Sequence, residues 1–179
     1  NKTKRKMIIL DFETNSQNIG DVIEVAAVKL KKIDGVFKII DKFHRYYLSR
    51  YSVNPYSYEV HKLTPELILA HRKDMNYASY FTEDLDFIQF CDDCDTLVAH
   101  NISFELRHLD RMVKFKNHFC TMKENKKVVK ALNKNGNIKN PKLDETCIFY
   151  EIDFDTVKYH SATYDVSKTY EILKRMKIV

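Results

Sequence analysis

Ile8-Ile9-Leu10-Asp11-Phe12-Glu13-Thr14 is a short apolar run that ends on two acidic residues. Such a run is typical of a buried β-strand, and we predict a first strand at about residues 6–13. Side chains two positions apart on a strand point to the same face, so Asp11 and Glu13 can reach one site. Because burying a pair of carboxylates is costly unless cations balance them, this pair favours a metal site over ordinary surface charge.

The segments that follow predict the rest of the sheet. Residues 22–31 and 36–46 read as two more strands joined by a turn at 32–35, and three consecutive strands this close form an antiparallel meander. Further along, the patterns predict a helix after Thr64-Pro65, helices at 76–92, after Ser103, at 142–151 and at 161–176, and strands at 95–100 and 118–122. This order predicts an α/β domain with a mixed central sheet, the meander plus parallel strands, flanked by helices.

Length and composition narrow the class of protein. The 179 residues suit a single domain spanning residues 1–179, and the 44% hydrophobic content argues against a disordered chain. No apolar run approaches the ~20 residues that span a bilayer, and no signal-type segment follows the N-terminus, so we expect a cytoplasmic protein without a membrane partner. The net charge of +5 fits a polyanionic partner, although an ordinary solvated surface explains it equally well.

Two more clusters of polar residues complete the candidate chemistry. They are His100-Asn101-Ile102-Ser103-Phe104-Glu105 and His160-Ser161-Ala162-Thr163-Tyr164-Asp165. Carboxylates from three parts of a chain can hold two hard divalent cations, while a nearby histidine accepts a proton from water. Since a spacing of five does not share a helix face, we place His160 just before a helix and Asp165 in its first turns. Carboxylates that hold two metal ions beside a proton-accepting histidine are the combination that phosphodiester hydrolysis requires.

These motifs resemble the DEDDh (DnaQ-like) family of 3′-to-5′ exonucleases, the group that contains the proofreading epsilon subunit of bacterial DNA polymerase III. Its D-x-E motif is matched by Asp11-Phe12-Glu13, its second motif by residues 100–105, and its H-x-x-x-x-D motif by His160 and Asp165. Residues 22–28, 61–66 and 141–145 are also similar, so the resemblance covers the chain in order. The related branch with tyrosine in the third motif would need it at position 161, where Ser161 stands.

The resemblance implies an RNase H-like fold and a two-metal mechanism. Asp11, Glu13, Glu105 and Asp165 would bind two Mg²⁺ or Mn²⁺ ions, and His160 would deprotonate the attacking water. These five residues are the predicted catalytic set. The product would be a nucleoside 5′-monophosphate released from a 3′ end.

The candidates for binding the terminal nucleotide are Phe12, Thr14, Leu63 and Phe104, which lie beside motif residues; core packing competes with stacking on bases for the aromatic ones. The expected partner is a single-stranded or frayed 3′ end, DNA more than RNA, with a polymerase or another replication or repair protein as a further possible partner.

Position 105 departs from the family pattern: the family usually has Asp there, whereas this chain has Glu105, whose side chain is longer by one methylene. We expect activity to survive, since charge at a metal site matters more than modest reach. Two alternatives stay open: an RNA 3′-to-5′ exonuclease, because the same metals cleave both backbones, and a non-catalytic nucleic-acid-binding module with a weakened site. The remaining acids and His160 argue against the second alternative.

Overall fold

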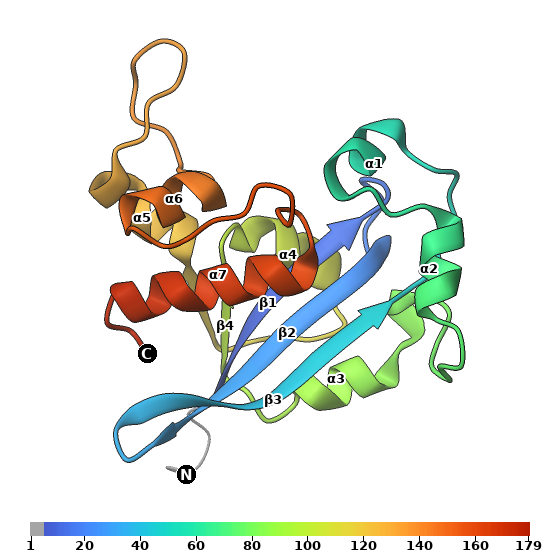
Figure 1. The fold of residues 1–179 in the computed structure, drawn as a ribbon. Helices are drawn as coiled ribbons and strands as arrows, with labels where there is room; N and C mark the ends of the chain where they lie inside the picture. Colours follow the sequence, from blue (N-terminus) through green and yellow to red (C-terminus); the bar gives the residue numbers. More distant parts are fainter. Residues whose placement is uncertain (1–5) are drawn as a thin grey trace.

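The computed structural model describes residues 6–179, and a five-stranded mixed sheet forms its centre. The strands are β1 (Lys6–Thr14), β2 (Val22–Ile33), β3 (Val36–Tyr46), β4 (Thr96–Ala99) and β5 (Asn117–Cys120), in the order β3-β2-β1-β4-β5. The pairs β1–β2 and β2–β3 are antiparallel, whereas β4 is parallel to both β1 and β5. The predicted meander with parallel strands beside it is therefore confirmed (Figure 1).

Seven α-helices are present in residues 6–179, and they connect or follow the strands. They are α1 (Pro55–His61), α2 (Pro65–His71), α3 (Leu85–Cys91), α4 (Ile102–Leu109), α5 (Thr121–Val129), α6 (Leu143–Phe149) and α7 (Ala162–Arg175). None of these described helices has the length and apolar character needed to cross a membrane.

The side chains of β1 point alternately to the two faces of the sheet, and each face has its own layer of core residues. Ile8, Leu10 and Phe12 pack with residues of α3 and α4 on one face of the sheet. Met7 and Ile9 face the other way and pack with Ala162, Val166 and Leu173 of α7 (Figure 1). Because Asp11 and Glu13 share the parity of Met7 and Ile9, they point to the face that α7 covers.

The predicted helix at residues 76–92 needs correction. The segment from residue 76 to 80 is not helical, and only Phe81–Glu83, a 3₁₀ turn, and α3 fall within the predicted helix 76–92. Arg72 holds this segment in place by donating hydrogen bonds to the carbonyls of Tyr46, Tyr77 and Ala78 at 2.7–3.1 Å. The Arg72 side chain thereby joins this segment to Tyr46 at the end of β3, a contact that local periodicity does not reveal.

Helix α1 was not predicted, although its start has a clear local cause. Asn54 caps it by accepting hydrogen bonds from the backbone of Tyr56 and Ser57, and Pro55 is its first residue. Helix α5 begins at Thr121, so the predicted strand 118–122 ends at Cys120, and the rest of α5 lies where the sequence pattern predicted no element. Polar and basic residues cover its surface, so an apolar stripe is too narrow to signal a helix.

Candidate active site

Strand β1 carries the first two acids to the end of the sheet. Asp11 lies opposite Ala26 and Glu13 opposite Glu24 on β2, and the register shifts between Glu13 and Thr14, where β1 ends. Glu13 is 7% exposed, and Oδ2 of the half-buried Asp11 is fully enclosed. Two carboxylates thus meet a third, Glu24, in a region with little access to water.

The start of α7 brings the third motif to the same place. His160 precedes the helix in a left-handed conformation with φ of 68°, and its backbone N–H donates to Asp165 Oδ1 at 3.2 Å. Its imidazole stacks on the Tyr159 ring with centroids 3.7 Å apart. Asp165 lies in the first turn of α7 and is 6% exposed. The predicted placement of both residues is confirmed.

Helix α4 contributes the second motif from the opposite layer. Glu105 is 2% exposed, and its Oε2 has no hydrogen-bond partner among residues 6–179. Burial raises its pKa to about 8, and the nearby charge of Asp165 adds to this, while the backbone amides of Glu105 and Phe12 act in the opposite direction. The longer side chain therefore delivers its carboxylate into the same electrostatic environment as Asp165.

The acids and the histidine form one cluster. Ligand atoms of Glu13, His160 and Asp165 lie within 4.8 Å of one another. Burial raises the pKa of Asp11 well above its ordinary value, and the negative charges of Glu13, Asp165 and Glu105 raise it further. Glu13, His160 and Asp165 are therefore close enough to share a cation, and Asp11 and Glu105 are near enough for their charges and that of Asp165 to act on one another.

A divalent cation fits this cluster chemically. Asp11 Oδ2 and Glu105 Oε2 are buried oxygens without partners in the described chain, and a buried carboxylate oxygen in this state is costly. The donors are mostly hard carboxylates, which Mg²⁺ and Mn²⁺ prefer.

The pKa values of the acids show how strongly the cluster resists ionisation without metal. Burial raises the pKa of Asp165 to about 7, with Glu24 contributing, and a hydrogen bond from the His160 backbone acts the other way. Burial also raises the pKa of Glu13 well above its ordinary value, followed by the charges of Asp165, Glu24 and Glu105. For His160, burial lowers the pKa, so its imidazole is neutral at pH 7.

We predict that the metal-free protein loses stability as the pH rises from about 5 to about 8. Unfolded Asp and Glu lose their protons near pH 4, whereas folded Asp165 and Glu105 keep theirs until about 7 and 8. The folded state therefore binds more protons than the unfolded state in this window, so the free energy of unfolding falls with pH. Each tenfold difference in proton affinity corresponds to about 1.4 kcal/mol, or roughly 3–6 °C in Tm for a domain of this size.

Thermal melts with chelator and with Mg²⁺ at both pH values check this prediction. Mg²⁺ should raise Tm more at the higher pH, where protons no longer compete for the carboxylates. Sodium chloride at matched ionic strength is the control for screening. Equal stabilisation by Mg²⁺ at both pH values would contradict the assignment of these carboxylates to a cation site.

Glu24 is a site residue whose role the sequence reasoning missed. It is 2% exposed, its Oε2 pairs with Nε2 of His44 at 2.7 Å, and its Oε1 accepts a hydrogen bond from the N–H of Ala162 at 3.1 Å. Glu24 thereby ties β2 and β3 to the first residue of α7, next to Asp165. The available signal was a charged residue inside the apolar run 22–28, which demands a partner when buried.

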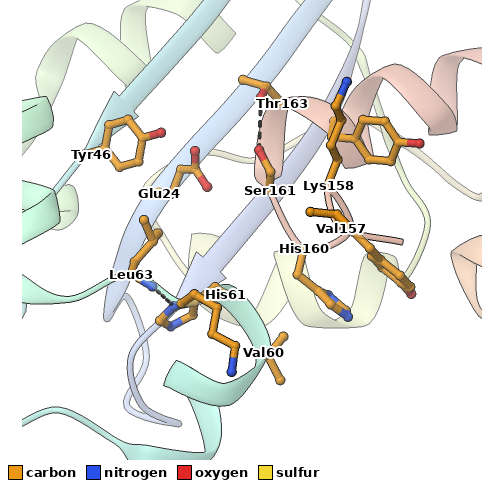
Figure 2. Close-up of a pocket in the computed structure, with 13 residues that line it drawn as sticks. Glu24, Tyr46, Val60, His61, Leu63, Val157, Lys158, His160, Ser161 and Thr163 are labelled. Carbon is orange, nitrogen blue, oxygen red and sulfur yellow. Dashed lines mark hydrogen bonds between the residues drawn. The ribbon is translucent and has the colours of Figure 1, made fainter. Parts of the chain in front are cut away.

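A cavity of about 450 Å³ lies beside the cluster and offers room for a ligand. Its walls come from residues 60–63, at the end of α1 and directly after it, and from residues before and at the start of α7, with Glu24 and Tyr46 from the sheet. Figure 2 shows His61 and His160 on the two opposing segments. His61 is in one tautomer: its Nδ1 accepts from the Leu63 N–H, and its Nε2 donates to the Thr14 carbonyl at 3.2 Å.

The predicted nucleotide-binding residues separate into two groups. Leu63 is half-buried and lines the cavity, and Thr14 is joined to its wall through His61. Phe104 is half-buried and packs edge-on against His108 with centroids 5.0 Å apart, away from the cavity lining. The Phe12 side chain is 2% exposed and packs against Phe81 and Phe87. The prediction that the Phe12 ring stacks on a base is therefore wrong, because the core encloses that ring.

Comparisons with known proteins agree with the fold. A family described as Exonuclease, of the RNase T type, matches residues 8–173. A structure of Exonuclease X in complex with 5′-overhanging duplex DNA is similar with a TM-score of 0.63 at 20% identity, over 96% of this chain and 92% of that one. A structure of E. coli Exonuclease I in complex with a dT13 oligonucleotide gives a TM-score of 0.73 at 14% identity, over 97% of this chain but 41% of that one. The search of curated proteins returned no match.

Proposed function

This chain belongs to the exonuclease family, whose match spans residues 8–173, and we propose that it is a metal-dependent 3′-to-5′ exonuclease that releases nucleoside 5′-monophosphates. One observation carries the proposal. Four carboxylates from β1, α4 and α7 converge beside a neutral histidine, and two of their buried oxygens lack a partner within residues 6–179. A cluster of this kind is unfavourable by itself and becomes favourable when cations fill it.

Asp11, Glu13, Glu105 and Asp165 are the residues that would hold two Mg²⁺ or Mn²⁺ ions. When bound, such ions supply charge that stabilises the attacking and leaving oxygens of a phosphodiester. The carboxylates already lie in buried positions on strand and helix ends, so little rearrangement is needed to receive cations. Glu24 holds the start of α7 against the sheet and so positions Asp165.

His160 would accept the proton of the attacking water. Its pKa is lowered by burial, so the ring is neutral and available as a base at pH 7. Stacking on Tyr159 and the hydrogen bond from its own backbone to Asp165 restrict where the ring can lie. The imidazole also borders the 450 Å³ cavity, where a terminal nucleotide would enter. Leu63 and Thr14 are the residues we assign to contacting that nucleotide.

DNA is the substrate we favour, because both structural neighbours described above were solved with DNA. A role in proofreading or repair with a polymerase partner is the narrower form of this proposal. Digestion of labelled single-stranded DNA, of duplex DNA with a mismatched 3′ end and of RNA, each with Mg²⁺, Mn²⁺ or chelator, tests it. Mononucleotides should accumulate from the 3′ end only with metal. Absence of metal-dependent products from all three substrates would overturn the proposal.

Glu105 provides the sharpest variant for the same assay. We expect wild-type activity with Glu105, a reduction of less than about tenfold for Glu105→Asp, which keeps the charge, and a loss of about 10²-fold or more for Glu105→Ala. Glu66→Ala, at an exposed position of α2, is the matched control and should leave the rate unchanged. An inactive wild type that Glu105→Asp rescues would show that the natural site is degenerate and favour the non-catalytic binding module.

A further inference from the structure

The positive charge of this protein is concentrated in one segment, residues 123–142, which we call the basic arm. The arm contains seven of the 30 basic residues of the chain and only one of its 25 acidic residues. The rest of the chain therefore has 23 basic and 24 acidic residues. Six of the seven are exposed: Lys123, Lys126, Lys127, Lys130, Lys134 and Lys142. Within the described chain, the only ion pair of the arm joins Lys139 to Glu145 at 2.7 Å. The whole positive excess of the protein therefore lies here and remains largely unneutralised.

The centre of the basic arm is an ordered hairpin. Leu132 and Ile138 form an antiparallel bridge, and the backbone N–H of Lys139 donates to the carbonyl of Ala131 at 2.8 Å. At the tip, Oδ1 of Asn133 accepts hydrogen bonds from the backbone N–H groups of Asn135 and Asn137, both at 2.9 Å. The hairpin extends away from the helices α5 and α6 that flank it (Figure 1). Its lysines are thus presented on a defined scaffold.

The root of the basic arm is tied to the candidate active site. Nε2 of His100, at the end of β4, donates to the carbonyl of Pro141 at 3.0 Å, and its Nδ1 bonds the Thr121 hydroxyl at the start of α5. Glu145 fixes the same region by accepting from the backbone N–H of Lys142 at 2.9 Å. Leu143, which follows Lys142, packs in the same apolar cluster as Tyr159, which precedes His160, so the root of the arm lies beside the segment that carries the proposed base.

We propose that the basic arm binds the phosphate backbone of the substrate strand upstream of the bond that is cut. The inference rests on the proposed function and extends it to a substrate class. One side of the hairpin has about five residues, which corresponds to roughly 16 Å of strand, whereas stacked nucleotides are spaced by about 3.4 Å. Contacts along the arm therefore need several nucleotides beyond the 3′ end. The preferred substrate is a polymer, and a dinucleotide is too short to reach the arm.

Lysine contacts of this kind are independent of base sequence and depend on salt. The test variant replaces three exposed lysines of the arm by Lys126→Gln, Lys127→Gln and Lys134→Gln. The matched control replaces three exposed lysines of the β2–β3 hairpin by Lys31→Gln, Lys32→Gln and Lys38→Gln, which removes the same charge at the opposite end of the sheet. Neither triple variant touches the carboxylate cluster.

The experiment measures kcat and KM with Mg²⁺ on a dinucleotide and on DNA and RNA 20-mers, and Kd for the 20-mers with chelator over a range of salt. The arm variant should show KM and Kd raised about tenfold or more on the 20-mers, with kcat and dinucleotide hydrolysis unchanged. The slope of log Kd against log salt should fall by up to about 2, since each lost single-strand contact contributes about 0.7. Effects on only one of the 20-mers would identify the sugar that the arm accepts.

Two results would overturn the inference: equal binding by the arm variant and wild type, or an equal loss in the control variant, which would mean that net charge alone matters. Failure of the proposed function looks different, because the wild type would then release no nucleotide from any substrate. The metal-free Kd measurements still decide the role of the arm in that event.

Discussion

Asp11→Asn should reduce kcat/KM on labelled single-stranded DNA by about 10³-fold or more, and at the same time raise the Tm of the metal-free protein at about pH 8. The activity falls because a neutral amide cannot balance the cations, whose charge stabilisation contributes several kcal/mol to a phosphodiester transition state. The stability rises because burial and the charges of Glu13, Asp165 and Glu105 all oppose ionisation of Asp11. The substitution keeps the size of the side chain and removes that penalty.

Opposite changes in activity and stability distinguish this outcome from simple misfolding. Activity is measured with Mg²⁺ and Tm with chelator, and Asp34→Asn in the exposed turn between β2 and β3 is the matched control that should change neither. Retention of turnover within tenfold would remove Asp11 from the catalytic set. A lower Tm together with lost activity would mean that Asp11 serves the fold.

His160→Gln should lower kcat by about 10²–10⁴-fold while leaving KM nearly unchanged, because a general base acts in the transition state and contributes this range. Glutamine retains a polar side chain that can stack on Tyr159 but cannot accept a proton at neutral pH. Single-turnover rates on a DNA 20-mer measure the effect. His118→Gln, on the exposed part of β5, is the control.

The same variant separates two roles that the geometry allows for His160. Its ring lies within 4.8 Å of the ligand atoms of Glu13 and Asp165, close enough to bind a cation together with them. A proton acceptor can be replaced without changing the increase in Tm that Mg²⁺ produces. If His160→Gln abolishes that increase, His160 is a metal ligand and the assignment as base is wrong.

Local patterns predicted most of the sheet, because its strands are buried and their side chains leave a clear signature. The predicted strands at 6–13, 22–31 and 36–46 correspond to Lys6–Thr14, Val22–Ile33 and Val36–Tyr46. Predictions failed where tertiary contacts overrode periodicity, as in the irregular segment before α3 that is hydrogen-bonded by Arg72. They also failed in α5, where the exposed face is broad and basic.

For the candidate site, the sequence identified the catalytic candidates but not the residues that support them. Residue type and spacing identified five catalytic candidates, of which Glu13, His160 and Asp165 have ligand atoms within 4.8 Å of one another, while the charges of Glu13, Asp165 and Glu105 act on Asp11. The roles of Glu24 and of the cavity wall at His61 were not apparent, because each depends on partners more than 15 positions away. Phe12 was misassigned for a different reason: alternation along β1 places its ring in the layer opposite to the acids, where the core encloses it.

The amino-acid sequence alone determines most strands and helices, the membership in a family of exonucleases and the identity of the candidate acids and histidine. These features depend on local spacing and on residue chemistry, both of which can be read without coordinates. Only the tertiary structure decides which carboxylate oxygens are buried without partners, how far burial and neighbouring charges raise their pKa values, and that the root of the basic arm packs beside the segment of Tyr159 and His160. Those properties depend on distances and solvent access between segments that are remote in sequence, and folding is what sets both.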